Sequence, residues 1–526
     1  MQTLLLASLV LLSASTLAAQ TSEELIKADP NNWLMYSGTY DSKRHSLLKQ
    51  INPSNVQNVA PKWVYHISGS IKLEAVPIVV NGVMFVAQLN HVDALDARTG
   101  RLIWQYRRQP VSRGAHRGIA VSDNKVYVGT ADAHVIALDA RNGAVRWETK
   151  IQGEDVRYQG GAPLVIRNKV LVGGNSRVGG FIDAYDTESG KQLWRWNSLP
   201  KPGEPGSETW AGDSLKLGGG PMWHTGSYDP QLDLAYFGTG QPGMDFVGDY
   251  RKGDNLYTDC MVALDPETGK MKWYFQFTPH DVHDYDAVEI PILVDATFKG
   301  QPRKLLLQAN RNGYYYILDR TNGKFLQGTP FVKVITWASG LTEDGRPVVV
   351  PGSEPSVQGT KVCPPTAGAT NWPSPAYSPD TRLFYVIVTE GCGINIRGAS
   401  KFEIRPGAPV GSGTGYLESP DVQERWQLYV RALDAFTGKT AWDYKQIGSN
   451  HYGPGVVSTA GGIVFAGEQQ GNLTALDAKT GKPLWHFNTG DFISASPIVY
   501  GVAGNQYVAI VAGSNVIAFG LSGGAK

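Results

Sequence analysis

The sequence predicts an all-β protein, specifically an eight-bladed β-propeller of four-stranded antiparallel blades with tryptophan-docking motifs. Three observations lead to this prediction. A hairpin motif that ends in Trp recurs along the chain. Gly accounts for 61 of 526 residues, well above the usual share of roughly 7%, and indicates many tight turns. Gly and Pro also punctuate the chain too often for long helices.

The repeated motif has the form A-x-D-x-x-[TNS]-G-x-x-x-W. In each copy, apolar alternation before the Asp predicts a half-buried strand, Asp and Gly predict a tight turn, and Trp returns on the next strand as a large buried plate. Each copy is therefore expected to be one β-hairpin. The copies span residues 94–104, 137–147, 184–194, 263–273, 432–442 and 475–485, with a degraded copy at 317–323.

The spacing of the motifs matches propeller blades. Trp147 follows Trp104 by 43 residues, as Trp485 follows Trp442, and a four-stranded blade takes about 40–45. Longer gaps predict inserted loops at residues 199–221, 241–255 and 404–415. Seven motifs give seven blades, and we expect residues 33–45 to close an eighth against residues 507–521, which removes both exposed edges. An open β-solenoid is the alternative.

The first residues have the character of an export signal. An apolar stretch from Leu4 to Ala14 precedes the small residues Ala18 and Ala19, which predicts a signal peptide over 1–19 and a mature β-propeller domain over 20–526. An N-terminal helix of the mature protein is the alternative. No later apolar run approaches the ~20 residues of a membrane span. The expected location is the periplasm, without a transmembrane segment.

The charge balance excludes one class of partner. The formal net charge is +1, with 48 Lys and Arg against 47 Asp and Glu, and no basic block occurs. A nucleic-acid partner requires a basic surface, so none is expected. Apolar residues make up 42% of the chain, with 14 Trp, which excludes intrinsic disorder.

Residues between the motifs resemble those of a known family. The stretches GGGPMWHTGSYDP at 218–230, TPHDVHDYDAV at 278–288 and ANRNGYYYILDRTNG at 309–323 are similar to those of the quinoprotein alcohol dehydrogenases. That resemblance implies an eight-bladed propeller that binds pyrroloquinoline quinone (PQQ) and a metal ion on its axis. It spans nearly the whole mature chain. The chain has no CxxCH motif for c-type haem, so it resembles the members without a cytochrome domain.

Residues 280–286 gather three carboxylates and two imidazoles. In extended backbone, Asp284 and Asp286 would point to the same side, about 6–7 Å apart, and could bind one hard cation. A solvated acidic loop and a transition-metal hydrolase site are the alternatives. The resemblance implies that Asp284 is the catalytic base, that Asp286 is the extra carboxylate of lanthanide-using members, and that Arg311 hydrogen-bonds the reacting quinone oxygens.

Five more residues match cofactor-contacting positions of the family. Trp223 matches the tryptophan that stacks beneath the planar cofactor, an aromatic contact worth ~1 kcal/mol beyond burial. Arg117 and Glu74 match residues at the cofactor's polar edge, where Arg suits bidentate pairing. Asn371 and the adjoining Trp372 match further cofactor contacts. The alternatives are a core tryptophan and ordinary surface or turn residues.

The sequence also departs from the family at the metal site. Asn175 stands where a metal-binding Glu is expected, and Gln241 stands where an Asn is expected. With Asp284 and Asp286 as the remaining ligands, the formal charge is −2, the same as in a calcium-type site. Since hard cations are held largely by ligand charge and oxygen count, the metal is expected to be calcium or a lanthanide, and Asp286 alone does not decide between them.

Two further departures concern cofactor contacts. Val111 and Ser112 occupy the positions where many members carry adjacent cysteines that form a disulfide ring over the cofactor. Gly453, with Tyr452 beside it, stands where an aromatic residue is expected.

The resemblance also assigns the cysteines. Cys363 and Cys392 are similar to a structural disulfide pair of the family, and closing that loop would contribute roughly 3–4 kcal/mol. Cys260 would then remain unpaired as a small buried residue.

The resemblance implies a periplasmic PQQ- and metal-dependent dehydrogenase that oxidises an alcohol to an aldehyde or ketone. Hydride would pass to the quinone and electrons to a soluble cytochrome c, and the protein could form a homodimer. Two alternatives stay open. One is a cofactor-free propeller that serves as an interaction scaffold, and the other is a PQQ enzyme acting on an amine, a sugar or a polymer-derived alcohol.

Overall fold

A computed structural model describes residues 22–27, 29–68, 73–109, 115–158, 160–177, 179–398, 415–421, 425–448 and 453–523. The predicted signal peptide, the Val111–Ser112 pair and Tyr452 lie outside these residues. Within them, the helical elements are the short α1 (Ser22–Ile26) and the 3-10 turns η1 (Val56–Asn58), η2 (Ser207–Thr209) and η3 (Ser214–Leu217). No helix in these ranges is long and apolar enough to cross a membrane.

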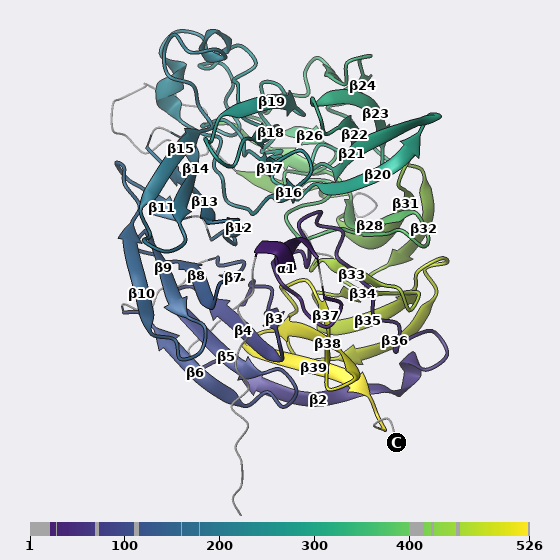
Figure 1. The fold of residues 1–526 in the computed structure, drawn as a ribbon. Coiled ribbons are helices and arrows are strands. Elements are labelled where there is room, and N and C mark those ends of the chain that lie inside the picture. The colour runs from purple at the N-terminus through teal and green to yellow at the C-terminus, as the bar shows by residue number, and fades with distance from the viewer. Residues whose placement is uncertain are drawn as a thin grey trace, which may run out of the picture.

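Antiparallel sheets surround a common centre (Figure 1). The first four contain β3 (Ile78–Val80), β4 (Val83–Gln88), β5 (His91–Asp96) and β6 (Leu102–Arg107); β7 (Ala120–Ser122), β8 (Lys125–Gly129), β9 (His134–Asp139) and β10 (Val145–Lys150); β12 (Leu164–Ile166), β13 (Lys169–Ser176), β14 (Gly179–Asp186) and β15 (Gln192–Asn197), with β11 (Arg157–Tyr158) added; and β16 (Ser227–Asp229), β17 (Leu234–Gly238), β18 (Cys260–Leu264) and β19 (Met271–Gln276).

The ring continues with four more sheets of the same order. They contain β20 (Ile292–Phe298), β21 (Gln301–Ala309), β22 (Tyr314–Asp319) and β23 (Lys324–Pro330); β27 (Ala376–Ser378), β28 (Leu383–Glu390), β31 (Gln427–Asp434) and β32 (Thr440–Lys445); β33 (Val456–Thr459), β34 (Ile463–Gly467), β35 (Asn472–Asp477) and β36 (Pro483–Asn488), with β1 (His45–Ser46) added; and β37 (Ile498–Val502), β38 (Asn505–Ala512), β39 (Asn515–Leu521) and β2 (Val59–His66).

Two small sheets lie in insertions outside the ring sheets. One is the hairpin of β24 (Ala338–Leu341) and β25 (Pro347–Val349). The other contains β26 (Thr360–Val362), β29 (Gly393–Asn395) and β30 (Tyr416–Glu418). β24, β25 and β26 follow the fifth ring sheet in the chain, whereas β29 and β30 are inserted between β28 and β31 of the sixth.

Each predicted motif forms the hairpin of the third and fourth strands of a sheet. The register places the motif Ala opposite the motif Trp, as Ala94 pairs with Trp104 and Ala137 with Trp147. The motif Asp fixes the turn, since Oδ1 of Asp96 accepts hydrogen bonds from the amides of Arg98 and Thr99 at 2.9 Å each. The hairpin prediction is confirmed.

The indoles connect neighbouring sheets. In six places, the Trp Nε1–H donates to a backbone carbonyl of the next sheet's motif turn. These pairs are Trp63 with Ala97 (3.2 Å), Trp104 with Ala140 (2.9 Å), Trp147 with Thr187 (3.0 Å), Trp194 with Pro266 (3.1 Å), Trp273 with Arg320 (3.1 Å) and Trp442 with Ala478 (3.2 Å).

The motif glycine meets the same indole. Gly190 has φ +68°, and a Cβ placed there would lie 2.5 Å from the Trp147 ring. Gly143 repeats the arrangement against Trp104, and Gly481 repeats it against Trp442. Glycine is therefore needed in the turn for two reasons, the left-handed backbone and the close approach of the preceding sheet's Trp.

The degraded motif uses another side chain for this contact. Gln327 occupies the Trp position of the fifth sheet, and its Nε2 donates to the carbonyls of Thr437 (3.0 Å) and Phe436 (3.4 Å) in the next motif turn. A polar amide thus replaces the indole N–H.

The N-terminal strand that completes the last sheet is not the one expected. β2 (Val59–His66) pairs with β39, so the prediction that residues 33–45 close the ring is wrong. The closing strand carries Trp63, which supplies the docking indole for the first motif. Sequence position alone did not reveal this because the β2 sequence lacks the motif turn.

Residues 31–46 instead run along the innermost strands of the sheets, near the centre of Figure 1. Their backbone bonds reach six of the eight ring sheets and a side-chain hydroxyl reaches a seventh, and we call this segment the plug. The contacts are Asn31 with Gly501, Trp33 with Val79, Tyr40 with Tyr228, Asp41 with Leu293, Lys43 with Tyr377 and Arg44 with Ser458, and the Tyr40 hydroxyl donates to Val165.

A buried cation holds the plug in place. The Arg44 side chain is fully buried and donates to the carbonyls of Tyr36, Val456 and Pro497.

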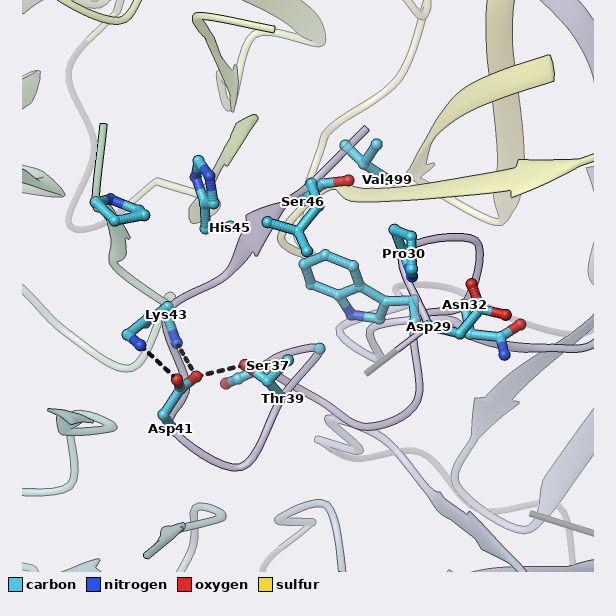
Figure 2. A pocket seen from close by; sticks show the side chains of 14 residues that line it. Asp29, Pro30, Asn32, Ser37, Thr39, Asp41, Lys43, His45, Ser46 and Val499 are labelled. Atoms are coloured by element: carbon cyan, nitrogen blue, oxygen red, sulfur yellow. Dashed lines mark hydrogen bonds and ion pairs between the residues drawn. The ribbon is translucent and has the colours of Figure 1, made fainter. Parts of the chain in front are cut away.

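The plug also lines a pocket of 200 Å³. Figure 2 shows this pocket, where Asp41 bonds Lys43 and Thr39. None of the predicted site residues lines it.

We expect Gly190→Ala to destabilise the fold by about 2–5 kcal/mol. This sum combines ~1–2 kcal/mol for a left-handed non-glycine residue with ~1–3 kcal/mol for overpacking against Trp147. Gly300→Ala is the matched control, because Gly300 has φ +79° and nothing within 4 Å of its added Cβ. It should lose only about 1–2 kcal/mol. Urea unfolding compares the two, and equal losses would contradict the docking contact.

Candidate active site

The predicted site residues all come to one end of the ring. Some immediately precede a first strand, namely Glu74, Arg117, Trp223, Asp284, Asp286, Asn371 and Trp372, and others end or follow a second strand, namely Asn175, Gln241 and Arg311. The first two strands of each sheet are antiparallel. The start of one therefore lies beside the end of the other.

A carboxylate-capped turn presents the two predicted carboxylates. Asp281 is buried, with Oδ1 accepting the amide of His283 (2.9 Å) and Oδ2 accepting that of Tyr285 (2.7 Å). This turn gives Asp284 a φ of +64°, so the predicted extended backbone is wrong here. Asp284 and Asp286 nevertheless face the same guanidinium.

The two imidazoles of this segment do not join the site. His280 Nδ1 bonds the carbonyl of Gly253 at 3.0 Å. His283 is buried against Tyr285 and Trp337. Burial lowers the pKa of His283 to about 3, so it is neutral. Neither ring faces Asp284 or Asp286. The nitrogen ligands that a transition-metal hydrolase site would need are therefore absent from this segment.

Arg311 contacts both predicted carboxylates. Its Nη1 lies 3.6 Å from Asp284 Oδ1 and donates to the Asp284 carbonyl at 2.9 Å. Its Nη2 lies 3.3 Å from Asp286 Oδ2 and donates to Asn371 Oδ1 at 3.2 Å. The Arg311 side chain is only 7% exposed. These contacts hold the guanidinium in one place, beside the two acids.

Trp223 lies against the same group of charged side chains and forms an aromatic wall beside them. Its indole N–H donates to Asp286 Oδ2 at 2.9 Å. The guanidinium carbons of Arg117 and Arg311 lie 4.6 and 5.6 Å from the ring centroid. Arg117 also lies 4.9 Å from the Trp372 ring. The three elements that the sequence placed together, an indole, an acid and a guanidinium, therefore converge.

Glu74 and Arg117 are also neighbours, as the resemblance implies. Arg117 Nη2 lies 3.6 Å from Glu74 Oε2, and both side chains are largely buried. The pair places one anionic and one cationic group beside the Trp223 ring. A flat, polar ligand could find both a stacking surface and hydrogen-bonding groups here.

The predicted amide ligands carry unsatisfied oxygens. Asn175 Oδ1 and Gln241 Oε1 are buried and accept no hydrogen bond. The Gln241 side chain bonds Asp245, and its backbone amide donates to Asp286 Oδ1 at 2.6 Å. Buried oxygens without donors are costly unless a ligand completes them. A hard cation, which takes oxygen ligands, fits these residues.

Carboxylates and imidazoles alone do not form a metal site. Among the described residues, no three His, Cys, Asp or Glu side chains are arranged to hold an ion. Any ion held beside Asp284 and Asp286 would need further oxygen ligands of another kind, such as amide oxygens. Burial raises the pKa of Asp284 well above its usual range, and the Asp286 carboxylate raises it further.

The sequence reading missed a buried carboxyl next to Arg311. Glu289 is 3% exposed, and its Oε1 lies 3.8 Å from Arg311 Nε. Burial raises the pKa of Glu289 to about 8, and Arg311 opposes this. The signal was present as a lone acid within the apolar run AVEIPILV, where an unpaired charge is rare.

His224 was also missed, although it is adjacent to Trp223. Its ring stacks on Trp223 with centroids 6.0 Å apart, and it meets Tyr36 of the plug edge-on at 5.1 Å. Nδ1 accepts the amide of Thr225 at 2.7 Å, so Nε2 is the donor to the Trp372 carbonyl at 3.1 Å. Burial lowers its pKa to about 3. This neutral ring links the plug to the aromatic wall.

The predicted disulfide is confirmed. Cys363 and Cys392 are bonded, and Cys260 is free and buried. The bridge is close in sequence to Pro364, whose carbonyl accepts the Tyr285 hydroxyl at 2.6 Å. The segment that carries Asn371 is thus tied to the turn that carries Asp284.

The chain matches known protein families. The family described as glucose/ethanol/alcohol dehydrogenase, beta-propeller domain, matches residues 33–336. A second family, described as outer membrane protein assembly factor BamB, matches residues 427–524. The quinoprotein alcohol dehydrogenase PedH of Pseudomonas putida is 36% identical, over 97% of this chain and 91% of that protein.

The chain belongs to the PQQ-dependent alcohol dehydrogenase family. The lanthanide-dependent methanol dehydrogenase of Methylacidiphilum fumariolicum is 35% identical, over 97% of this chain and 89% of that protein. The solved quinohemoprotein alcohol dehydrogenase of Comamonas testosteroni has a TM-score of 0.88 at 32% identity, covering 96% of this chain and 83% of that one. A europium-containing methanol dehydrogenase has a TM-score of 0.85 at 31% identity, covering 95% and 100%. This member of the family is an oxidoreductase.

Glu289 predicts a pH dependence of stability in the cofactor-free protein. Its pKa is about 8 when folded against an ordinary 4.5, so the folded state binds more protons between these values and loses stability as pH rises through them. The loss has an upper bound of about 5 kcal/mol. Urea unfolding at pH 5 and pH 8.5 should show wild type losing more stability than Glu289→Gln. Parallel losses would contradict the prediction.

Proposed function

We propose that this quinoprotein is an exported, PQQ- and metal-dependent dehydrogenase that oxidises an alcohol to an aldehyde or ketone. The convergence of Trp223, Asp284 and Arg311 at one end of the ring carries the proposal. We also infer that the eight ring sheets of the described chain, each with a four-stranded antiparallel core, are the blades of an eight-bladed propeller.

The residues around Trp223 suit PQQ. The Trp223 indole is suited to stacking on a flat ring, and the guanidiniums of Arg117 and Arg311 lie over this indole. Glu74, Asn371 and Trp372 complete the polar and aromatic surroundings. PQQ, when bound, supplies the acceptor for the hydride taken from the alcohol carbon.

The metal would be held by Asn175, Gln241, Asp284 and Asp286. Two of these residues supply amide oxygens that have no donor, and two supply carboxylates. The ion would supply positive charge where negative charge develops in the transition state. Relatives include a lanthanide-dependent methanol dehydrogenase, and calcium is the other cation that this chemistry accepts.

Asp284 would take the proton from the alcohol hydroxyl. Its side chain is 26% exposed, so it can reach a substrate. Burial and Asp286 raise its pKa in the bare protein, and the positive charge of Arg311 and of a bound ion would favour the ionised carboxylate that a general base requires. Arg311 keeps Asp284 in position through the backbone carbonyl and the carboxylate. Trp223 and Asp286 hold one another through the indole N–H.

The remaining expectations belong to the same proposal. We infer a periplasmic location, a small alcohol as substrate and a soluble cytochrome c as electron acceptor. The curated relatives named above include an alcohol dehydrogenase and a methanol dehydrogenase, which supports a small alcohol. An amine, sugar or polymer-derived alcohol is tested by the same assay with other substrates.

Asp284→Asn should lower the rate of alcohol oxidation at least about a hundredfold, because general-base catalysis typically contributes a factor of ~10²–10⁴ to the rate. The assay is dye-linked oxidation of short alcohols by the PQQ-loaded protein, with calcium and separately with a lanthanide. The absorbance of bound PQQ measures cofactor occupancy independently.

Asp249→Asn is the control, since that carboxylate is 59% exposed and pairs with Arg397 outside the site. It should keep wild-type activity. An Asp284→Asn enzyme with full turnover would remove Asp284 from the role of base, and a wild-type chain that binds no PQQ would overturn the proposed function.

A further inference from the structure

A third carboxylate near the proposed metal ligands has no hydrogen-bonding partner. Asp259 is fully buried, and neither of its carboxylate oxygens accepts a hydrogen bond. An ionised carboxylate in such a place is costly unless a positive charge compensates it. Asp259 has φ +52° and begins the approach to β18 (Cys260–Leu264). Asp259 is therefore a buried acid whose carboxylate oxygens receive no hydrogen bond from the rest of the fold.

The backbone places Asp259 beside the metal ligands. Its amide donates to the carbonyl of Gly240 at 3.0 Å. The next residue, Gln241, has an orphaned side-chain oxygen and donates its amide to Asp286 at 2.6 Å. The carboxylates of Asp281, Asp286 and Asp284 interact repulsively with Asp259. Asp259 thus belongs to the same acidic region, one strand away from Gln241.

The cation that interacts with Asp259, Arg251, makes its hydrogen bonds to other groups. Arg251 is fully buried and attracts Asp259, but its guanidinium donates to the Gly243 carbonyl (3.0 Å), Asn255 Oδ1 (2.9 Å) and the carbonyls of Met244 and Asp281. None of these bonds reaches the Asp259 carboxylate. Arg251 therefore lowers the repulsion without pairing the acid.

The region is strongly anionic as a whole. Six acids interact electrostatically with one another and with two arginines. The acids are Asp245, Asp259, Asp281, Asp284, Asp286 and Glu289, and the arginines are Arg251 and Arg311. If every acid is ionised, which a nearby cation favours, the set carries a formal charge of −4. A divalent ion would then leave −2 and a trivalent ion −1, so the trivalent ion comes closer to balance.

We infer that Asp259 supplies a third negative charge to the metal site, in place of the charge absent at Asn175, and that the site therefore favours a trivalent over a divalent cation. This inference rests on the proposed function. Among the described residues, no three His, Cys, Asp or Glu side chains are arranged to hold an ion, so Asp259 is assigned to act through its charge and not as a direct ligand. Its charge acts across a poorly solvated region, where Coulomb interactions are strong.

The test is metal binding by the full chain, loaded with PQQ and stripped of metal by a chelator. Tb³⁺ is the trivalent probe, read by its tryptophan-sensitised luminescence, and Ca²⁺ is measured by calorimetry. Wild type is compared with Asp259→Asn, and with Asp259→Ser as a second variant should the first fail to fold. Asp213→Asn is the surface control, since that side chain is 72% exposed.

Removing Asp259 should weaken Tb³⁺ binding about tenfold or more, and Ca²⁺ binding less. Because Coulomb energy scales with the product of the charges, the logarithm of the loss should be about 1.5 times larger for Tb³⁺. Adding Asn175→Glu to Asp259→Asn should restore Tb³⁺ affinity, because it returns the lost charge. Asp213→Asn should change neither affinity.

An Asp259 variant that binds Tb³⁺ as tightly as wild type would overturn the inference, as would equal losses for both ions. This failure is distinguishable from failure of the proposed function. If wild type binds PQQ and oxidises alcohols while the Asp259 variants keep their Tb³⁺ affinity, the function stands and the role of Asp259 falls. If wild type binds no PQQ, the proposed function itself falls.

Discussion

The contact between an indole and the glycine turn of the next sheet is the interaction on which the rest of this structure depends. It joins sheets that share no backbone ladder, by a hydrogen bond from Trp Nε1 and by a flat face against Cα of glycine. Because it recurs at matched positions, as at Trp104 and Trp147, each sheet is set against its neighbour in a similar way. The ring follows from repetition of this one contact.

That arrangement explains how residues far apart in sequence form one site. Glu74 and Asn371 both precede innermost strands, and Arg311 follows a second strand. Antiparallel pairing brings these chain positions to the same end of the ring. The plug then supports this end from within, since Tyr36 meets His224, which stacks on Trp223. Scaffold and site are thus connected through aromatic contacts.

At this end of the ring, buried acids outnumber the arginines that contact them. Arg311 serves several acids at once, including Asp284, Asp286 and Glu289. Burial raises the pKa of Glu289 and of Asp284, which reflects acids crowded where solvent and cations are scarce. The orphaned oxygens of Asn175 and Gln241 point to the same deficit. Positive charge is what the bare protein lacks, and a bound ion would supply it.

The sequence by itself determined the hairpins, the Trp anchors, the Cys363–Cys392 bridge and the identity of the three converging groups. These are local signals or close matches to family motifs, and a turn such as Asp96 to Gly100 is fixed by its own residues. Only the tertiary structure decided which N-terminal segment closes the ring. It also showed the burial and the surroundings of Glu289, His224 and Asp259. Their importance lies in burial and in partners from distant strands, and neither burial nor partners can be read from a residue's own neighbours along the chain.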